Sequence, residues 1–162
     1  MRDEALKALL EERWQAAAAK YGLRLLKDPD DGVARCNRAI ALYESGQWLK
    51  AARVFEDLLR REGPASEVAP PALFSLGSCR LKLRQDRASL EATTLFLELS
   101  DEDHPFFRDG VRNLACACRR LGHSALAAQL DRATAKRERI LRAAFKVLGW
   151  KRKPLPMTRR RR

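Results

Sequence analysis

The sequence predicts an all-α fold built from paired helices. Ala, Leu, Arg, Glu and Lys dominate its 162 residues, and these residue types form helices readily. Runs of Val, Ile or Thr that alternate with polar residues, as in strands, are absent. Small residues recur inside the predicted helices at a spacing of 38, at Ala39, Gly77 and Ala115. Because helices approach closely only where side chains are small, this recurrence indicates a repeated helix–helix contact.

Proline, glycine and turn residues divide the chain into helical segments. Residues 28–32 and the Gly63-Pro64 pair are typical breaks between elements. The Leu121-Gly122 pair is a typical helix end. The expected helices are 2–12, 14–27, 33–45, 48–61, 70–84, 87–99, 104–120 and 124–149, of which the last is one long helix.

The stretch from residue 34 to residue 64 shows how one helix pair is encoded. Ala39 and Ala51 are the expected points of close contact between its two helices. Aromatic residues of the pair, Trp48 and Phe55, would fill the space beside them. Gly46 lies between the helices, where a left-handed residue commonly ends the first of them. The stretch therefore predicts an antiparallel helical hairpin.

This pattern resembles the tetratricopeptide repeat, a helix–turn–helix unit of about 34 residues. The small residue, turn glycine, aromatic, alanine and second aromatic of that family match the residues just named, and Pro64 lies one place late. The second copy keeps Gly77 but has Arg84 where the turn glycine is expected. The third keeps Ala115 and Gly122 and lacks both aromatics.

The resemblance implies a right-handed α–α superhelix over residues 1–149, a solenoid of stacked helical hairpins. Its repeats would lie near 1–31, 33–63, 70–100 and 106–137, followed by a long C-terminal capping helix to residue 149. Residues 150–162 would form a flexible basic tail.

In the resembled family, the first helix of each pair lines a concave groove that binds a peptide or a partner helix. Carried over to this sequence, the groove would be apolar at one end and basic at the other, which suits a segment with apolar anchors and an acidic part. The corresponding residues are Val33, Cys36, Asn37, Ile40, Tyr43, Glu44, Phe74, Ser78, Leu81, Lys82, Asp109, Arg112, Cys116, Arg119 and Arg120.

Some members of that family hold a C-terminal carboxylate with two Asn and two basic residues. Asn37 matches one of those positions, but Asp109 and Asn113 stand where Lys and Arg are expected. We therefore interpret Asn37 and Asn113 as surface amides that bond to the backbone of the neighbouring repeat.

A second resemblance concerns the arrangement as a whole. Three such repeats after an N-terminal helix, in about 160 residues, are similar to the translocator chaperones of type III secretion. Residues 74–83, FSLGSCRLKL, resemble their middle repeat. Those chaperones are generally acidic, whereas this chain carries a net charge of +12.

Positive charge is concentrated at the C-terminal end. Residues 136–162 hold twelve Lys and Arg against Glu138 alone, so +11 of the net +12 lies there. The residues expected to carry this charge to a partner are Arg139, Arg142, Lys146, Lys151, Arg152, Lys153, Arg159, Arg160, Arg161 and Arg162.

Two interpretations of this end stay open. The apolar stripe formed by Ile140, Leu141, Phe145, Leu148 and Trp150 packs on the last repeat as a cap, or it inserts at a surface as a basic amphipathic helix. The tail beyond it either has no fixed partner or contacts nucleic acid, anionic lipid or an acidic protein.

No catalytic motif occurs, and we expect neither enzymatic activity nor a cofactor. Cys116 and Cys118 do not share a helix face, so no metal site is expected. The chain lacks a signal-peptide pattern and an apolar run of membrane-spanning length, which predicts a cytoplasmic protein. The sequence therefore favours an adaptor that binds a protein segment in its groove. The alternatives are a secretion-type chaperone and a non-specific binder of nucleic acid or anionic membranes through residues 136–162.

Overall fold

The computed structural model describes residues 4–132 and 136–151, and every regular element in these ranges is an α-helix. The prediction of an all-α fold is therefore confirmed for the described residues. The helices are α1 (Glu4–Leu10), α2 (Trp14–Lys27), α3 (Gly32–Glu44), α4 (Trp48–Glu62), α5 (Ala69–Lys82), α6 (Asp86–Leu99), α7 (Phe107–Arg120), α8 (Ser124–Asp131) and α9 (Arg137–Leu148).

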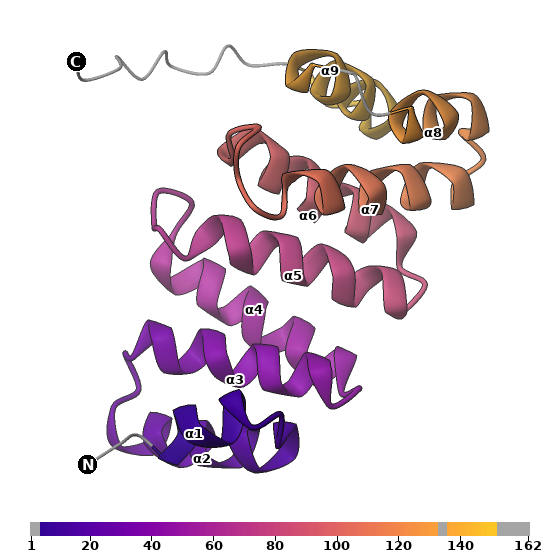
Figure 1. Ribbon diagram of the computed structural model, residues 1–162. Coiled ribbons are helices and arrows are strands. Elements are labelled where there is room, and N and C mark those ends of the chain that lie inside the picture. The colour runs from indigo at the N-terminus through magenta and orange to yellow at the C-terminus, as the bar shows by residue number, and fades with distance from the viewer. Residues whose placement is uncertain (1–3, 133–135, 152–162) are drawn as a thin grey trace.

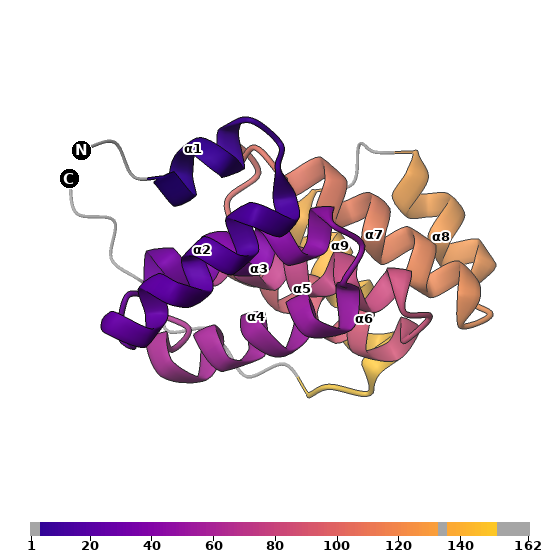
Figure 2. The ribbon, with the colours of Figure 1, turned by 90° about the horizontal axis from the view of Figure 1, so that it is seen from below.

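The helices are stacked in chain order. Each helix from α1 to α7 packs against the next one, and the hairpins α1/α2, α3/α4, α5/α6 and α7/α8 follow one another from the bottom to the top of Figure 1. α3, α5 and α7 also contact one another in succession. Seen from below, α7 lies along one side of the stack and α4 and α6 along the other (Figure 2). We call these two sides the α3–α5–α7 face and the α4–α6 face.

The same backbone turn closes all four hairpins. One residue of each turn is left-handed: Glu12 with φ 55°, Gly46 with 79°, Arg84 with 59° and Gly122 with 88°. Its amide donates to the carbonyl three residues earlier at 3.0–3.1 Å, and the next amide donates to the carbonyl five residues earlier at 2.8–2.9 Å. This is the hydrogen-bond pattern that satisfies the last carbonyls of a helix. The predicted roles of Gly46 and Gly122 are confirmed, and the chain makes the same turn at Arg84 without a glycine.

Small residues lie at the helix contacts, as predicted. Ala39 and Ala51 have no solvent exposure, and Ala115 is 1% exposed. Gly77 is buried so closely against α6 that a Cβ there would lie 2.4 Å from the Thr93 hydroxyl oxygen. The recurrence at a spacing of 38 therefore marks the places where the hairpin helices meet.

The C-terminal region does not form the single helix predicted over residues 124–149. α8 ends at Asp131, and α9 begins at Arg137 after a change of direction. α8 runs antiparallel to α7, which has 14 residues, so a straight helix from Ser124 would pass the start of α7 after about 14 residues. The remaining turns, with their apolar stripe, would project into water.

α9 instead folds back against α6 and α7. At its start, the Arg137 guanidinium donates to the carbonyls of Leu97, at 2.9 Å from Nε, and Glu98. At its end, the Arg87 guanidinium donates to the Leu148 carbonyl at 3.3 Å. Because Arg87 lies at the start of α6 and Leu97 near its end, α9 is antiparallel to α6. These contacts bury the apolar stripe of α9, and Ile140, for example, is 2% exposed.

The lengths of the helices also bear on a membrane location. Among the described residues, none of the helices combines the length and the apolar character that a bilayer crossing requires.

Candidate functional site

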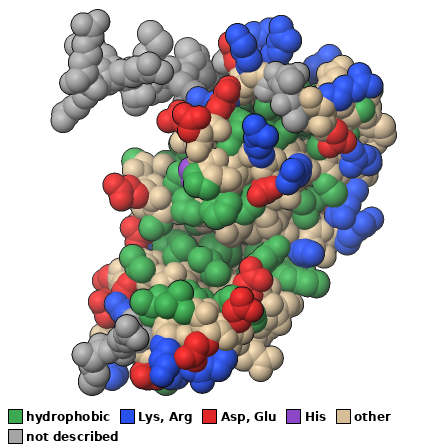
Figure 3. Space-filling view, viewed as in Figure 1, with side chains coloured by type: hydrophobic (Ala, Val, Ile, Leu, Met, Phe, Trp, Pro, Cys, Tyr) green, Lys and Arg blue, Asp and Glu red, His purple; other side chains and the backbone are tan. Residues whose placement is uncertain are grey.

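The α3–α5–α7 face carries a hollow of about 330 Å³ where the C-terminal ends of its helices meet. Five of the predicted groove residues converge there from three helices, together with two further residues. Figure 3 views this face, on which apolar side chains run across the middle and Lys and Arg gather along the right-hand edge. The residues that line the hollow are Tyr43, Ser78, Leu81, Lys82, Arg84, Asn113 and Arg120.

The electrostatics of the hollow are basic, but two of its cations are already held in place. The Arg120 guanidinium donates to the Leu81 carbonyl at 3.0 Å and to Asp86 at 3.1 Å. The Lys82 ammonium lies 5.8 Å from the centre of the Trp48 ring, which is within cation–π range. Burial, followed by Cys79 and Glu44, raises the pKa of the Tyr43 phenol above its ordinary value of 10.0, so the group, neutral at pH 7 in any case, keeps its proton further into alkaline solution.

Two amides connect α3 to α2 and α7 to α5, although not through the backbone bonds that we expected. The Asn37 amide donates to the Tyr21 hydroxyl at 3.1 Å, and the Asn113 amide donates to the Ser78 hydroxyl at 2.9 Å. The Ser78 hydroxyl donates to the Phe74 carbonyl at 3.1 Å. Both amides therefore bond to side chains of neighbouring helices. The backbone there is already paired within its own helix, which explains the difference.

Other predicted groove residues lie on the same helices but outside the hollow. Cys36 and Ile40 are half-buried along α3, and Cys116 is half-buried on α7, whereas Val33 and Glu44 are exposed. Phe74 stacks on Phe106, with ring centres 4.9 Å apart, so its ring is engaged within the protein. The remaining charged residues form local pairs. Arg112 bonds to Asp109 at 2.7 Å, and Arg119 pairs with Asp131.

A larger and more apolar groove lies on the opposite α4–α6 face, and the sequence analysis did not identify it. Its volume is about 560 Å³, its floor is α5, and its walls are α4 and α6. Leu95 and Leu99 in its wall are 38% and 40% exposed. The lining residues are Glu56, Leu59, Pro64, Leu73, Leu76, Arg80, Ala88, Glu91, Ala92, Leu95, Glu98 and Leu99.

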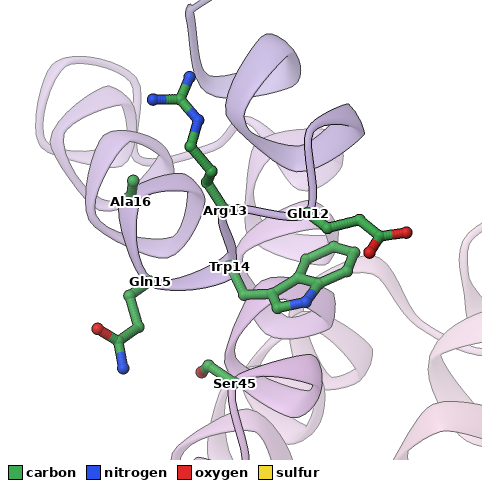
Figure 4. Close-up of a pocket in the computed structure, with 6 residues that line it drawn as sticks. All are labelled: Glu12, Arg13, Trp14, Gln15, Ala16 and Ser45. Atoms are coloured by element: carbon green, nitrogen blue, oxygen red, sulfur yellow. The ribbon is translucent and has the colours of Figure 1, made fainter.

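A third hollow, of about 340 Å³, lies beside the turn between α1 and α2. In Figure 4 the Trp14 ring points to one side, with Glu12 above it, whereas Arg13 and Gln15 point the other way. Ser45, from the turn that ends α3, approaches from below. The hollow combines one aromatic ring with polar side chains that point in different directions, so these side chains do not form a binding site for a ligand.

The outer side of α9 is basic. Arg139, Arg142 and Lys146 are exposed there, and Arg142 bonds to Glu138 at 3.2 Å. Because the apolar residues of α9 pack against α6 and α7, they are not available to insert at a surface, which corrects that alternative. Lys151 is exposed, and the predicted contact residues Arg152, Lys153 and 159–162 lie outside the described residues.

In the part of the chain that the structure describes, metal ligands and reactive thiols do not form a site. Among the described residues, no group of three His, Cys, Asp or Glu side chains could hold a metal ion. The four cysteines are free, and burial raises the pKa of Cys79 to about 12 and that of Cys118 to about 11. The Cys79 and Cys118 thiols therefore remain protonated at neutral pH and are unsuited to nucleophilic chemistry.

Two features of the site could have been found in the sequence. Arg84 lines the hollow and lies 38 residues after the turn glycine Gly46. The same spacing relates Ala39 to Gly77, so it could have placed Arg84 at the equivalent turn. Leu95 and Leu99 are four residues apart on one predicted helix, and they could have indicated a second apolar surface.

Comparisons with known proteins do not add a family to these observations. No protein-family model matches the sequence, and no curated protein matches it either, so the functional argument depends on the geometry described above.

Proposed function

We propose that this protein is a non-enzymatic interaction module whose α3–α5–α7 face binds a segment of a partner protein. The observation that carries the proposal is the convergence of Tyr43, Lys82, Arg84 and Arg120 on one hollow. In this proposal the hairpin stack is a degenerate tetratricopeptide-type superhelix. The free cysteines agree with a cytoplasmic location, where thiols stay reduced.

The chemistry of the hollow selects the part of the partner that binds there. Lys82 and Arg84 offer charge to a carboxylate, while the Tyr43 hydroxyl and the Asn113 amide provide hydrogen-bonding groups at its edge. Along α3, half-buried Ile40 and Cys36 continue the surface as an apolar strip. The proposed ligand is therefore an extended or helical segment with an acidic residue followed by apolar anchors.

A photo-crosslinking residue placed at position 82 in the native cell tests this proposal. It should capture a partner that mass spectrometry can identify, and the same residue at exposed Arg53 on α4 is the matched control. With the partner in hand, Tyr43→Ala and Lys82→Glu should each weaken binding by about tenfold. Unchanged affinity in both variants would exclude this face as the binding site.

A second candidate function follows from the exposed cations of α9. Arg139, Arg142 and Lys146 lie three and four residues apart on its outer side and could contact phosphate groups of nucleic acid or anionic lipid. The double variant Arg139→Glu/Arg142→Glu and the deletion of residues 151–162 should each weaken binding to generic DNA, RNA or acidic vesicles. Added salt should weaken it further. If the intact protein binds none of these at low salt, this candidate fails.

A further inference from the structure

The apolar groove of the α4–α6 face has a counterpart elsewhere in the chain. The hairpin turns at Gly46, Arg84 and Gly122 are spaced by 38 residues, so the same spacing relates α4, α5 and α6 to α6, α7 and α8. Leu59, Leu73, Leu76 and Ala92 of the open groove correspond in this register to Leu97, Val111, Leu114 and Leu130. The molecule therefore contains two grooves built from equivalent positions.

The second groove is covered by α9. Its floor and walls belong to the same apolar cluster as Ile140, Leu141, Ala144 and Leu148 of that helix. Leu97 and Leu114 have no exposure beneath it, whereas their counterparts in the open groove retain some: Leu59 is half-buried and Leu76 is 8% exposed. The chain itself thus shows what fills a groove of this kind, namely an amphipathic helix that runs antiparallel to α6 and directs its cations outward.

We propose that the open groove of the α4–α6 face is a docking site for an amphipathic helix of a partner protein, with Leu, Ile or Phe on its buried side and Lys or Arg along its edges. This surface is separate from the α3–α5–α7 face, so the inference does not depend on the function proposed above.

The charges around the open groove specify a basic occupant. Three glutamates, Glu56, Glu91 and Glu98, line it against the single cation Arg80, which pairs with Glu56. The Glu91 carboxylate lies 3.4 Å from Nε of Arg87. The Glu98 carboxylate has no ion pair among the described residues. In the covered groove, the counterparts of Glu56 and Glu91 are the neutral Thr94 and Gln129. An occupant of the open groove therefore meets more negative charge than α9 does.

Two occupants from this chain itself fit less well. The sequence beyond Lys151 is basic, but it contains Pro154 and Pro156, and proline is unfavourable in the interior of the helix that the groove calls for. The α9 helix of a second copy keeps its apolar side buried against its own α6 and α7. A helix from a different protein meets neither obstacle.

A synthetic peptide with the sequence of residues 136–151 is the appropriate probe, because α9 is the helix that fills the equivalent groove. Labelled with a fluorophore and titrated into the full-length protein, it should bind with micromolar affinity by fluorescence anisotropy. A photo-reactive analogue of its phenylalanine, at the position of Phe145, should crosslink to residues of α4, α5 or α6 around Leu95. Binding should weaken as salt is added.

Substitutions in the wall of the groove locate the site. Leu95→Arg should weaken the affinity for the peptide by about tenfold or more, because it places a positive charge, like those of the peptide, and a bulky side chain in the apolar wall. Leu49→Arg is the matched control, since Leu49 is also an exposed leucine, 46% exposed, but does not line the groove, and it should leave the affinity unchanged. Glu98→Gln should weaken binding by about two- to threefold at low salt.

Three results would overturn the proposal. The first is equal peptide affinity in the Leu95→Arg and Leu49→Arg proteins. The second is crosslinking to α7 or α8, which would mean that the peptide replaces α9 in the covered groove. The third is a strong rise in peptide affinity after deletion of residues 152–162, which would identify the chain's own tail as the occupant.

Discussion

Arg84 and Glu12 occupy turn positions that glycine fills at Gly46 and Gly122. A side chain in the left-handed region costs about 1–2 kcal/mol, because its Cβ approaches the following carbonyl oxygen. Both residues nevertheless adopt positive φ, at 59° and 55°. The packing of the flanking helices therefore determines the turn, and the residue at its centre accepts the strain.

Replacing Arg84 by glycine tests that interpretation. Arg84→Gly should raise the free energy of unfolding by about 0.5–1 kcal/mol, because the relief of strain exceeds the extra chain entropy that glycine loses on folding. Gly46→Ala should lower it by about 1 kcal/mol for the opposite reason. Urea denaturation followed by circular dichroism measures both changes. If Arg84→Gly proved destabilising, the energetic assignment would be wrong.

Gly77, one of the recurring small residues, packs closely against α6. A Cβ there would lie 2.4 Å from the Thr93 hydroxyl oxygen, and Gly77→Ala should lower the free energy of unfolding by about 1–3 kcal/mol. The double variant Gly77→Ala/Thr93→Ala should recover part of this loss, because the second change removes the clashing group. A double-mutant cycle measures the coupling, and strictly additive effects would contradict the contact.

At the scale of elements, α9 is held by its two ends. Arg137 donates to two carbonyls at the end of α6, and its own amide donates to the Glu102 carboxylate at 2.9 Å. These bonds satisfy carbonyls that the last turn of α6 would otherwise leave without partners. Arg137 thus caps the C-terminal end of α6 and fixes the start of α9 against it.

Removal of that side chain should loosen α9 without unfolding the hairpins. Arg137→Ala should cost about 1.5–3 kcal/mol in the docking of α9, since charged hydrogen bonds are lost. Hydrogen exchange should speed up in α9 and at the end of α6, and dye binding to exposed apolar surface should increase. Arg139→Ala, on the exposed side of the same helix, should change stability by less than about 0.5 kcal/mol.

The sequence predicted the elements that depend on local signals. Gly46, Gly122 and the buried Ala39 and Ala115 fixed the hairpins, because turns and close contacts require particular residue types. The break between α8 and α9 was missed because the apolar stripe continues in phase through residues 124–149, and neither a glycine nor a proline stands between Asp131 and Arg137 to mark it. The α4–α6 groove was missed for a related reason. The spacing of Leu95 and Leu99 indicates an apolar helix face, but it does not show whether another helix covers that face.

For the molecule as a whole, stability should fall in alkaline solution. Burial raises the pKa of the Cys79 thiol to about 12 and that of Cys118 to about 11, from an ordinary value of 9.0. The unfolded chain therefore loses these protons first as the pH rises above 9, and unfolding becomes more favourable up to about pH 11–12. The sign follows from the raised pKa of each acid in the folded state.

Comparison with a variant isolates this effect from other titrating groups. The free energy of unfolding of the native protein should decline more steeply between pH 8 and pH 11 than that of Cys79→Ala/Cys118→Ala. Urea denaturation at several pH values, under reducing conditions, gives both curves. Parallel curves would show that these thiols do not ionise differently in the two states.

The position of α9 has a consequence for how the protein is made. α6, α7 and α8 leave the ribosome before α9, so their apolar groove stays bare until residue 148 has emerged. During that interval Leu97, Val111 and Leu114 can attach to any apolar segment nearby. A chain that ends before Arg137 would keep this surface permanently uncovered and should aggregate. Loss of the residues beyond Lys151 should leave α9 in place over the groove.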